Sequence, residues 1–366
     1  MNETPRPFRL GDLLGHERAK SLLAAAVAAD AYPNAWLFAG PMGVGKYTAA
    51  LAVAAAANCR AGDDGGGGLF GGAPAKPEPR TDACGTCASC RKIAAANHPD
   101  VRTIRVPADK RVIPIESVRE AIGELSYRPY EGRRRFVIVD GAESLTPQAS
   151  NALLKTLEEP PAHSTWILVS TSPARLLPTI VSRCRIVRFG ALDVETAAGL
   201  LAREGKMERG EARAIAGLLG GSVGRALGPD AEHFSQETRA QVIDEALDAI
   251  GAGGGKILDI AEAWDKRAKD ETLPLPTALE QLSLFIRDVA ALQAASLDAR
   301  AAILMHSDLA DRTDRAARRA PSDGATRAFD SVRRCVNDLK GNVNSRLALE
   351  TMFLALRREL VPQAPR

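Results

Sequence analysis

Residues 40–48 read Gly-Pro-Met-Gly-Val-Gly-Lys-Tyr-Thr, and this stretch decides the fold. It matches the phosphate-binding pattern G-x-x-x-x-G-K-[ST] except at its last position, where Tyr47 replaces the small hydroxyl residue. In such a loop the glycines let backbone N–H groups approach the phosphates, the lysine reaches the terminal phosphates, and the hydroxyl ligates magnesium. A phenol is too long for that position, and Thr48 lies about 100° further round the following helix. The loop is therefore predicted to cradle a nucleotide while lacking one metal ligand.

The sequence around the loop supplies the strand and the helix that this motif requires. An apolar run at residues 35–39 leads directly into the loop, and residues 46–58 form an alanine-rich segment that is predicted to be helical. Four further apolar runs follow, with helical patterns between them at residues 115–125 and 150–157. These runs cover residues 101–106, 136–140, 166–171 and 185–189. Their alternation with helices predicts an α/β domain with a parallel sheet covered on both faces.

The strand signals stop after Gly190, and this change sets the predicted domain boundaries. We expect the α/β domain at residues 1–190, short helices at residues 191–232 and longer helices at residues 233–366. Within the first domain, residues 61–80 contain four consecutive glycines and three prolines, which predicts a flexible insertion.

The composition is that of a folded protein with little net charge. Of its 366 residues 45% are hydrophobic and only 4% aromatic, which favours helical bundles and a buried parallel sheet. Forty-eight basic residues against 45 acidic ones give a net charge of +3, which argues against a surface coated for nucleic-acid binding. The first 14 residues carry charges where a secretory signal would have an apolar core. We therefore expect a cytoplasmic protein, in which cysteines serve as metal ligands or buried thiols rather than disulfides.

Four of the six cysteines form a candidate metal site between residues 59 and 90. Cys84, Cys87 and Cys90 form a C-x2-C-x2-C motif, and Cys59 ends the helix that follows the glycine loop. Four thiolates match a closed tetrahedral zinc site, whose role is structural. An iron–sulfur cluster is the alternative, but the sequence lacks the C-x3-C-P partner that such clusters use, so zinc is favoured.

An acidic residue at the end of a strand bears on whether the chain can hydrolyse a nucleotide. Asp140 ends an apolar strand, which is the arrangement that places a carboxylate beside the magnesium of a bound nucleotide. Where ATPases of this class have a second acid, this chain has Gly141, so the catalytic base is missing as well. We interpret Glu143 as a solvated carboxylate at a helix start rather than as a substitute base. The residues expected to face a nucleotide are Gly40, Gly43, Gly45, Lys46, Thr48, Asp140, Thr171 and Arg225.

Two arginines invite a role in phosphate recognition. Arg183 lies in Ser182-Arg183-Cys184, just before the last apolar run, and an arginine held there can act in trans on a neighbour's phosphates. Arg225 follows a glycine-rich segment and is predicted to begin a helix. From spacing alone, a surface arginine in a weak ion pair remains the simpler interpretation of both.

These motifs together resemble one known family. Residues 150–161 read Ser-Asn-Ala-Leu-Leu-Lys-Thr-Leu-Glu-Glu-Pro-Pro, which is similar to the N-A-L-L-K-x-L-E-E-P-P segment of clamp-loader subunits. With Ser182-Arg183-Cys184, the cysteine motif and His98-Pro99-Asp100, the chain resembles the delta-prime family of the bacterial DNA polymerase III clamp loader, within the AAA+ superfamily. The match runs in order from Leu14 to the Gly-Gly-Ser-Val-Gly-Arg segment at residues 220–225 and is weaker in the last third.

The resemblance implies an architecture, partners and roles. It implies an AAA+ domain with a zinc module at residues 59–90, a helical lid at 191–232 and a helical collar at 233–366 that joins a pentamer. The implied partners are gamma/tau and delta subunits, with the sliding clamp and primer-template DNA reached through the complex. Arg183 would be a finger offered to a neighbouring gamma/tau ATP site. The chain would thus belong to a DNA-directed DNA polymerase, a nucleotidyltransferase, without being expected to hydrolyse ATP itself.

The alternative is a gamma/tau-like subunit that binds and hydrolyses ATP. Such subunits share the cysteine motif, the L-E-E-P-P segment and S-R-C. However, they are expected to keep Thr or Ser after the loop lysine and Glu after the strand-ending Asp. Tyr47 and Gly141 depart from both requirements, which favours the non-hydrolysing member.

Overall fold

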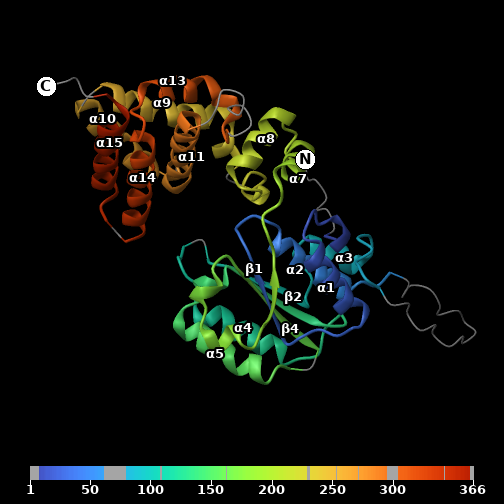
Figure 1. The fold of residues 1–366 in the computed structure, drawn as a ribbon. Helices are drawn as coiled ribbons and strands as arrows, with labels where there is room; N and C mark the ends of the chain where they lie inside the picture. Colours follow the sequence, from blue (N-terminus) through green and yellow to red (C-terminus); the bar gives the residue numbers. More distant parts are fainter. Residues whose placement is uncertain are drawn as a thin grey trace, which may run out of the picture. The chain divides into compact units, whose positions relative to one another are not determined.

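The computed structural model describes residues 8–61, 80–107, 109–161, 163–228, 231–252, 254–270, 272–294, 304–341 and 343–362. The insertion predicted at residues 61–80 lies outside these ranges except for its two end residues. The chain divides into two compact units, Met1–Leu192 and Asp193–Arg366, and each is described by itself (Figure 1).

The first unit is built on a five-stranded parallel sheet. Its strands lie in the order β2-β3-β4-β1-β5, and every neighbouring pair is parallel. The strands are β1 (Ala35–Ala39), β2 (Val101–Ile104), β3 (Arg135–Asp140), β4 (Ser164–Ser170) and β5 (Arg185–Arg188). The predicted parallel sheet is confirmed, and each apolar run of the sequence became a strand.

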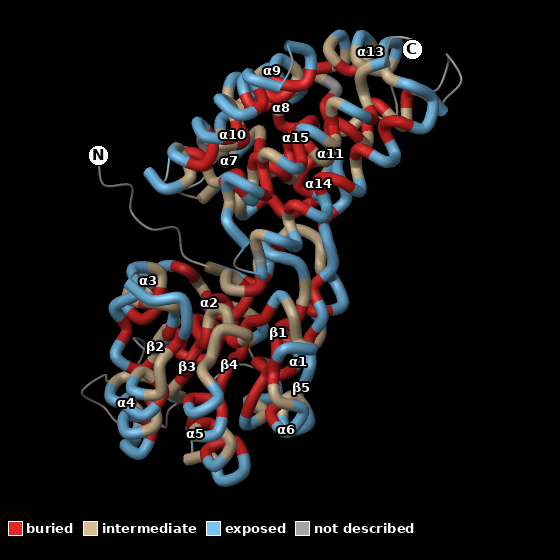
Figure 2. Tube along the Cα trace, turned by 90° about the vertical axis from the view of Figure 1, so that its left-hand side faces the viewer, coloured by how far each residue is buried: buried red, intermediate tan, exposed pale blue. Residues whose placement is uncertain are grey.

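Helices cover both faces of this sheet, as the continuous burial of β1 and β4 requires. Side chains alternate along β1, so that Trp36 and Phe38 belong to one hydrophobic cluster and Leu37 to the other. On the first face lie α1 (Glu17–Ala28), α2 (Lys46–Ala57) and α3 (Ala88–Ala94); on the second lie α4 (Ile115–Leu125), α5 (Pro147–Glu158) and α6 (Pro178–Val181). Figure 2 shows the buried residues concentrated along the strands between these layers.

Helix α2 begins directly at the end of the glycine loop. Ten of its 12 residues are buried, and eight of those ten are alanine or valine, whose small side chains let the helix lie close against its neighbours. The helix therefore holds the loop firmly at the carboxyl end of β1, where Ala39 is followed by Gly40.

The described residues of the second unit contain helices and no strand, in agreement with the loss of strand signals after Gly190. Its α-helices are α7 (Val194–Glu204), α8 (Arg209–Leu218), α9 (Gln236–Ala252), α10 (Gly254–Lys269), α11 (Leu275–Ala294), α13 (Ala310–Arg319), α14 (Gly324–Lys340) and α15 (Ser345–Leu360). Trp264, Phe285 and Phe353 lie fully buried in its core. Among the described residues of the whole chain, no helix combines the length and apolarity needed to cross a membrane.

The prediction that Arg225 begins a helix was wrong. Arg225 ends η4 (Val223–Arg225), a single 3-10 turn, and the next helical segment, η5, starts only at Ala231. Gly220 and Gly221 both have positive φ angles that end the preceding helix. The short turn after them closes on itself through the Ala226 N–H, which donates to the Val223 carbonyl at 3.0 Å.

Candidate nucleotide and metal sites

The glycine loop joins β1 to α2 and is shaped by its glycines. Gly45 caps α2 with a φ of 96°, a conformation that favours glycine. Gly40 packs so tightly against the edge strand that a Cβ added to it would lie 2.2 Å from the Phe189 carbonyl oxygen. His16 also supports the loop, because its Nε2 donates to the Val44 carbonyl at 2.8 Å. The backbone of the loop therefore has the conformation that its glycines predicted.

Lys46 lies inside this loop rather than in solvent. Its side chain is buried, and Nζ donates to the carbonyl oxygens of Gly40 at 2.9 Å and Pro41 at 2.5 Å. Burial lowers the pKa of Lys46, while the nearby carboxylates of Glu143 and Asp140 act in the opposite direction. The ammonium group is thus bonded to loop carbonyls and interacts electrostatically with two acids.

Tyr47 points away from the position that a magnesium-binding hydroxyl would take. Its phenol oxygen lies 3.2 Å from the Thr103 Oγ1, on the last part of β2. The guanidinium of Arg105 lies over the Tyr47 ring, with its Cζ 4.3 Å from the ring centroid. The Nε of the same arginine donates to Asp140 Oδ2 at 3.0 Å.

Arg105 is a site residue that the sequence analysis missed. No local pattern in the sequence marks it, because its position depends on strand pairing: β2 and β3 pair in parallel with Ile104 opposite Val139. The next residues along the two strands, Arg105 and Asp140, therefore lie side by side at the carboxyl ends of these strands. Recognising the pair would have required knowing that these two strands are neighbours.

The interpretation of Glu143 as a carboxylate at a helix start is confirmed, but the expectation that it is solvated was wrong. Glu143 lies in η2 (Ala142–Ser144), a one-turn helix that folds over the strand ends. Its Oε1 accepts hydrogen bonds from the Thr171 N–H at 3.1 Å and from the Thr171 hydroxyl, while its Oε2 is buried and has no hydrogen-bond partner among the described residues. Burial raises the pKa of Glu143, but the hydrogen bonds outweigh it and hold the pKa below its ordinary value.

The predicted nucleotide-facing residues of the first unit thus lie together at the carboxyl ends of the strands. The loop glycines and Lys46 follow β1, Asp140 ends β3 and Thr171 follows β4. Thr48 lies half-buried in the first turn of α2. Arg225 belongs to the second unit, where its guanidinium pairs with both Glu280 carboxylate oxygens at 3.1 and 2.8 Å and lies over the Phe234 ring. The roles of these residues toward a nucleotide stay predictions.

Arg183 lies just after the short helix α6 and is exposed. Its Nη2 lies 2.6 Å from Glu158 Oε1, at the end of α5, and its Nη1 donates to the Thr179 carbonyl at 2.9 Å. The partner is the first glutamate of the L-E-E-P-P segment. The two motifs that carry the resemblance therefore meet in one ion pair.

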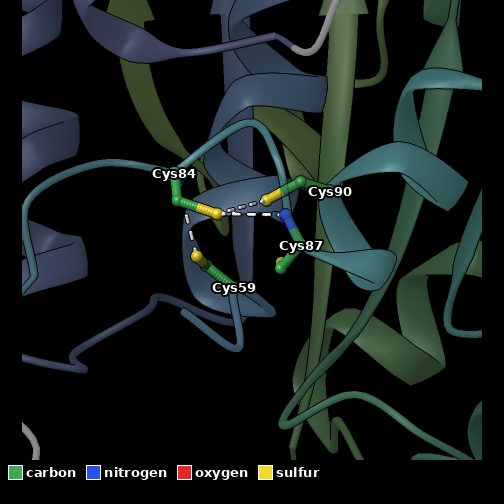
Figure 3. Close-up of side chains that lie close together, drawn as sticks. All are labelled: Cys59, Cys84, Cys87 and Cys90. Atoms are coloured by element: carbon green, nitrogen blue, oxygen red, sulfur yellow. Dashed lines mark hydrogen bonds between the residues drawn. The ribbon is translucent and has the colours of Figure 1, made fainter. Parts of the chain in front are cut away.

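The four predicted metal ligands come together at the end of α2, as Figure 3 shows. The sulfur atoms of Cys59, Cys84, Cys87 and Cys90 all lie within 4.8 Å of one another. A tetrahedron of sulfurs about 2.3 Å from a zinc ion has edges of about 3.8 Å, so the cluster needs little adjustment to close around one. These cysteines could therefore hold a metal ion, and the donor set suits zinc.

Hydrogen bonding prepares one of these thiols for that role. Burial raises the pKa of Cys84, but the hydroxyl and N–H of Thr86 and the N–H of Cys87 outweigh it and lower the pKa to about 6. For Cys59 and Cys90 burial prevails and raises the pKa. A metal ion would supply the positive charge that these buried thiolates need.

Comparison with known proteins gives a consistent picture. Residues 15–193 match the family described as DNA polymerase III, delta subunit. The chain is 28% identical over 340 residues to DNA polymerase III subunit delta' of Bacillus subtilis, which covers 93% of this chain and 95% of that protein. It is 35% identical over 190 residues to DNA polymerase III subunit tau of Salmonella typhimurium, which covers 52% of this chain.

Two further facts define the extent of these similarities. The chain spans only 27% of the length of the tau proteins of Salmonella typhimurium and Escherichia coli. The crystal structure of a gamma subunit-related protein from Thermotoga maritima aligns over 94% of this chain and 99% of its own, with 16% identity and a TM-score of 0.41. Over residues 15–193 the chain therefore matches the DNA polymerase III delta-subunit family, and its similarity to a delta' subunit over most of its length confirms the resemblance to clamp-loader subunits that its motifs indicated.

Proposed function

We propose that this chain acts as a delta-prime-type subunit of a DNA polymerase III clamp loader, working in the cytoplasm during DNA replication. In this role it assembles with gamma/tau and delta subunits and helps to load the sliding clamp onto primer-template DNA. The observation that carries the proposal is the state of the glycine loop. Tyr47, which stands at the metal-ligand position, is engaged with Thr103, in a chain that aligns along most of its length with a delta' subunit.

The loss of hydrolysis follows from the missing groups. With no Ser or Thr hydroxyl at position 47 and Gly141 in place of the second acid, neither the metal nor the attacking water has its usual partner. The glycines and Lys46 remain, so we propose that the loop still holds a nucleotide. The four cysteines would bind a structural zinc ion that pins the segment after α2.

Arg183 is the residue that would act on a neighbour. It is exposed, and its bond to Glu158 joins two partly solvated side chains. Such surface pairs contribute only about 0–1 kcal/mol, so exchanging Glu158 for the phosphates of a gamma/tau-bound ATP costs little. A planar guanidinium then offers paired donors to the charge that develops during phosphoryl transfer.

The experiment that tests this function uses the complex reconstituted with gamma/tau and delta. Arg183→Ala is expected to leave the complex assembled but to lower the ATP hydrolysis rate at the adjacent site by about 10³-fold or more. Arg185→Ala removes another exposed arginine two residues on and serves as the matched control. A complex that forms normally and hydrolyses ATP at an unchanged rate would refute the finger role, and a failure to assemble with wild-type chain would refute the function itself.

ATP hydrolysis by the purified chain alone distinguishes the proposed function from the alternative of a gamma/tau-like ATPase. The motif residues Lys46 and Asp140, together with the similarity to tau over half of the chain, are what favour it. Steady ATP turnover that disappears in Lys46→Ala would establish that alternative. We expect no turnover above that of Lys46→Ala.

A further inference from the structure

The residues at the glycine loop do not fit a magnesium ion. In loops of this type the protein holds magnesium through the hydroxyl after the lysine and through an aspartate at the end of a neighbouring strand. Position 47 offers a phenol, and this phenol is hydrogen-bonded to Thr103 at 3.2 Å. Asp140 accepts from Arg105 Nε at 3.0 Å. Both protein positions that would serve the metal are therefore engaged with other side chains.

Arg105 is held there by two independent contacts. Besides the bond to Asp140, its Cζ lies 4.3 Å from the centroid of the Tyr47 ring, which is a favourable place for a cation. Tyr47 thus does more than remove a hydroxyl from the loop. It also supplies the aromatic ring over which the Arg105 guanidinium lies.

Two positive and two negative side chains meet at the carboxyl end of the sheet. Lys46 and Arg105 are positive, and Asp140 and Glu143 are negative. A divalent cation placed next to Asp140 would meet the guanidinium of Arg105 and would have to displace it. A phosphate chain, by contrast, can accept hydrogen bonds from a guanidinium that is also bonded to a carboxylate, because the group carries several N–H donors.

We propose that this loop binds a nucleoside triphosphate as the metal-free polyphosphate, with Arg105 taking the place of the magnesium ion. The inference rests on the proposed retention of nucleotide binding by the loop, and it adds which form of the nucleotide is bound and which residue selects it. Tyr47 acts as a positioning residue for Arg105.

The test is ATP binding to the full-length chain, measured by titration calorimetry with EDTA and with excess magnesium. Wild-type chain is expected to bind ATP in EDTA at least as tightly as in magnesium. Magnesium bound to the phosphates competes with Arg105 for them, and the loop offers no side chains to ligate the metal. Arg105→Ala is expected to weaken binding in EDTA by about tenfold, the loss of one charge-assisted contact. Arg102→Ala is the matched control, since Arg102 lies in β2, which Arg105 directly follows, but pairs with Glu120 and Glu124 of α4.

A double variant tests the same proposal from the opposite direction. Tyr47→Thr with Arg105→Ala restores the hydroxyl and frees Asp140, so magnesium is expected to strengthen ATP binding in this variant alone. Binding by wild-type chain that requires magnesium would overturn the proposal. So would the absence of any binding at millimolar ATP, or an unchanged affinity in Arg105→Ala. None of these outcomes bears on Arg183, whose role is measured in the assembled complex.

Discussion

At the scale of single residues, the clearest constraint lies at Gly40. An added Cβ would lie 2.2 Å from the Phe189 carbonyl oxygen and 3.1 Å from the Phe189 carbonyl carbon, which are backbone atoms that cannot move aside easily. We therefore expect Gly40→Ala to lower the free energy of unfolding by about 3 kcal/mol, through overpacking and backbone strain. Gly190→Ala is the matched control, because nothing lies within 4 Å of its added Cβ. Urea denaturation of both variants measures the difference, and equal midpoints would contradict the close contact.

The residues of the site divide into those that spacing predicts and those that it does not. Gly40, Lys46 and Tyr47 form one continuous motif, so their arrangement could be predicted from the sequence. Arg105 lies 35 residues from its partner Asp140, and Glu143 lies 28 residues from Thr171. Pairs that are far apart along the chain meet only through the order of the strands, which no local pattern contains.

At the scale of elements, the segment before β3 is held by two buried polar side chains. Asp100 accepts hydrogen bonds from the backbone N–H groups of Tyr130, Glu131 and Gly132 at 2.7–2.9 Å. Asn58 bonds the same segment through the N–H groups of Arg133 and Arg134 and through the Arg134 carbonyl. These bonds satisfy a turn whose backbone would otherwise lack partners, and they fix the start of the strand that ends in Asp140.

Asp100 makes this anchor sensitive to acid. Its burial raises its pKa, but the three backbone N–H donors and Arg135 outweigh burial and hold the pKa below its ordinary value. A depressed folded-state pKa means that the carboxylate stabilises the fold above its unfolded-state pKa and loses this contribution as the pH falls. We expect Asp100→Asn to cost roughly 3 kcal/mol at pH 7, because an amide N–H then faces backbone donors.

Urea denaturation at a series of pH values checks this anchor. The difference between wild type and Asp100→Asn should shrink as the pH is lowered below about 4, near the ordinary pKa of an aspartate. Asp12→Asn, at an exposed carboxylate of the same unit, is the control and should show little difference at any pH. A difference for Asp100→Asn that stays constant down to pH 2 would show that the charge of Asp100 does not matter.

The cysteine cluster is an element that spacing predicted well. The C-x2-C-x2-C motif is local, and although Cys59 lies 25 residues before Cys84, a fourth thiol completes a recognisable set of metal ligands. By contrast, the prediction that a helix begins at Arg225 was wrong, because the sequence of two glycines followed by a single turn resembles that of a helix start. Local patterns predict an element reliably when its contacts are themselves local.

Metal analysis of the purified chain tests the cysteine cluster. We expect one equivalent of zinc, and we expect Cys87→Ser to lose the metal and to unfold at a lower temperature. Cys184→Ser changes a thiol outside the cluster and should retain the full equivalent. Iron in place of zinc, or a wild-type chain without metal that unfolds at the same temperature as Cys87→Ser, would contradict the assignment.

At the scale of the whole molecule, the chain consists of two units with separate cores. The first unit buries clusters on both faces of its sheet, and the second buries a helical core around Trp264, Phe285 and Phe353. The units divide after Leu192, and the domain boundary that the sequence places at residue 190 stays a prediction. The further division of the helical part at residue 232 stays a prediction, since the residues after Asp193 form one compact unit.

Separate cores lead to a prediction about the isolated halves. Because each unit contains its own large set of buried apolar residues, residues 1–192 and 193–366 are each expected to fold when produced alone. The first fragment should retain the metal and show mixed α/β circular dichroism, whereas the second should show a purely helical spectrum. Thermal unfolding followed by circular dichroism should give one cooperative transition for each fragment. A fragment that lacks a cooperative transition, while the full chain has one, would show that its core depends on the other unit.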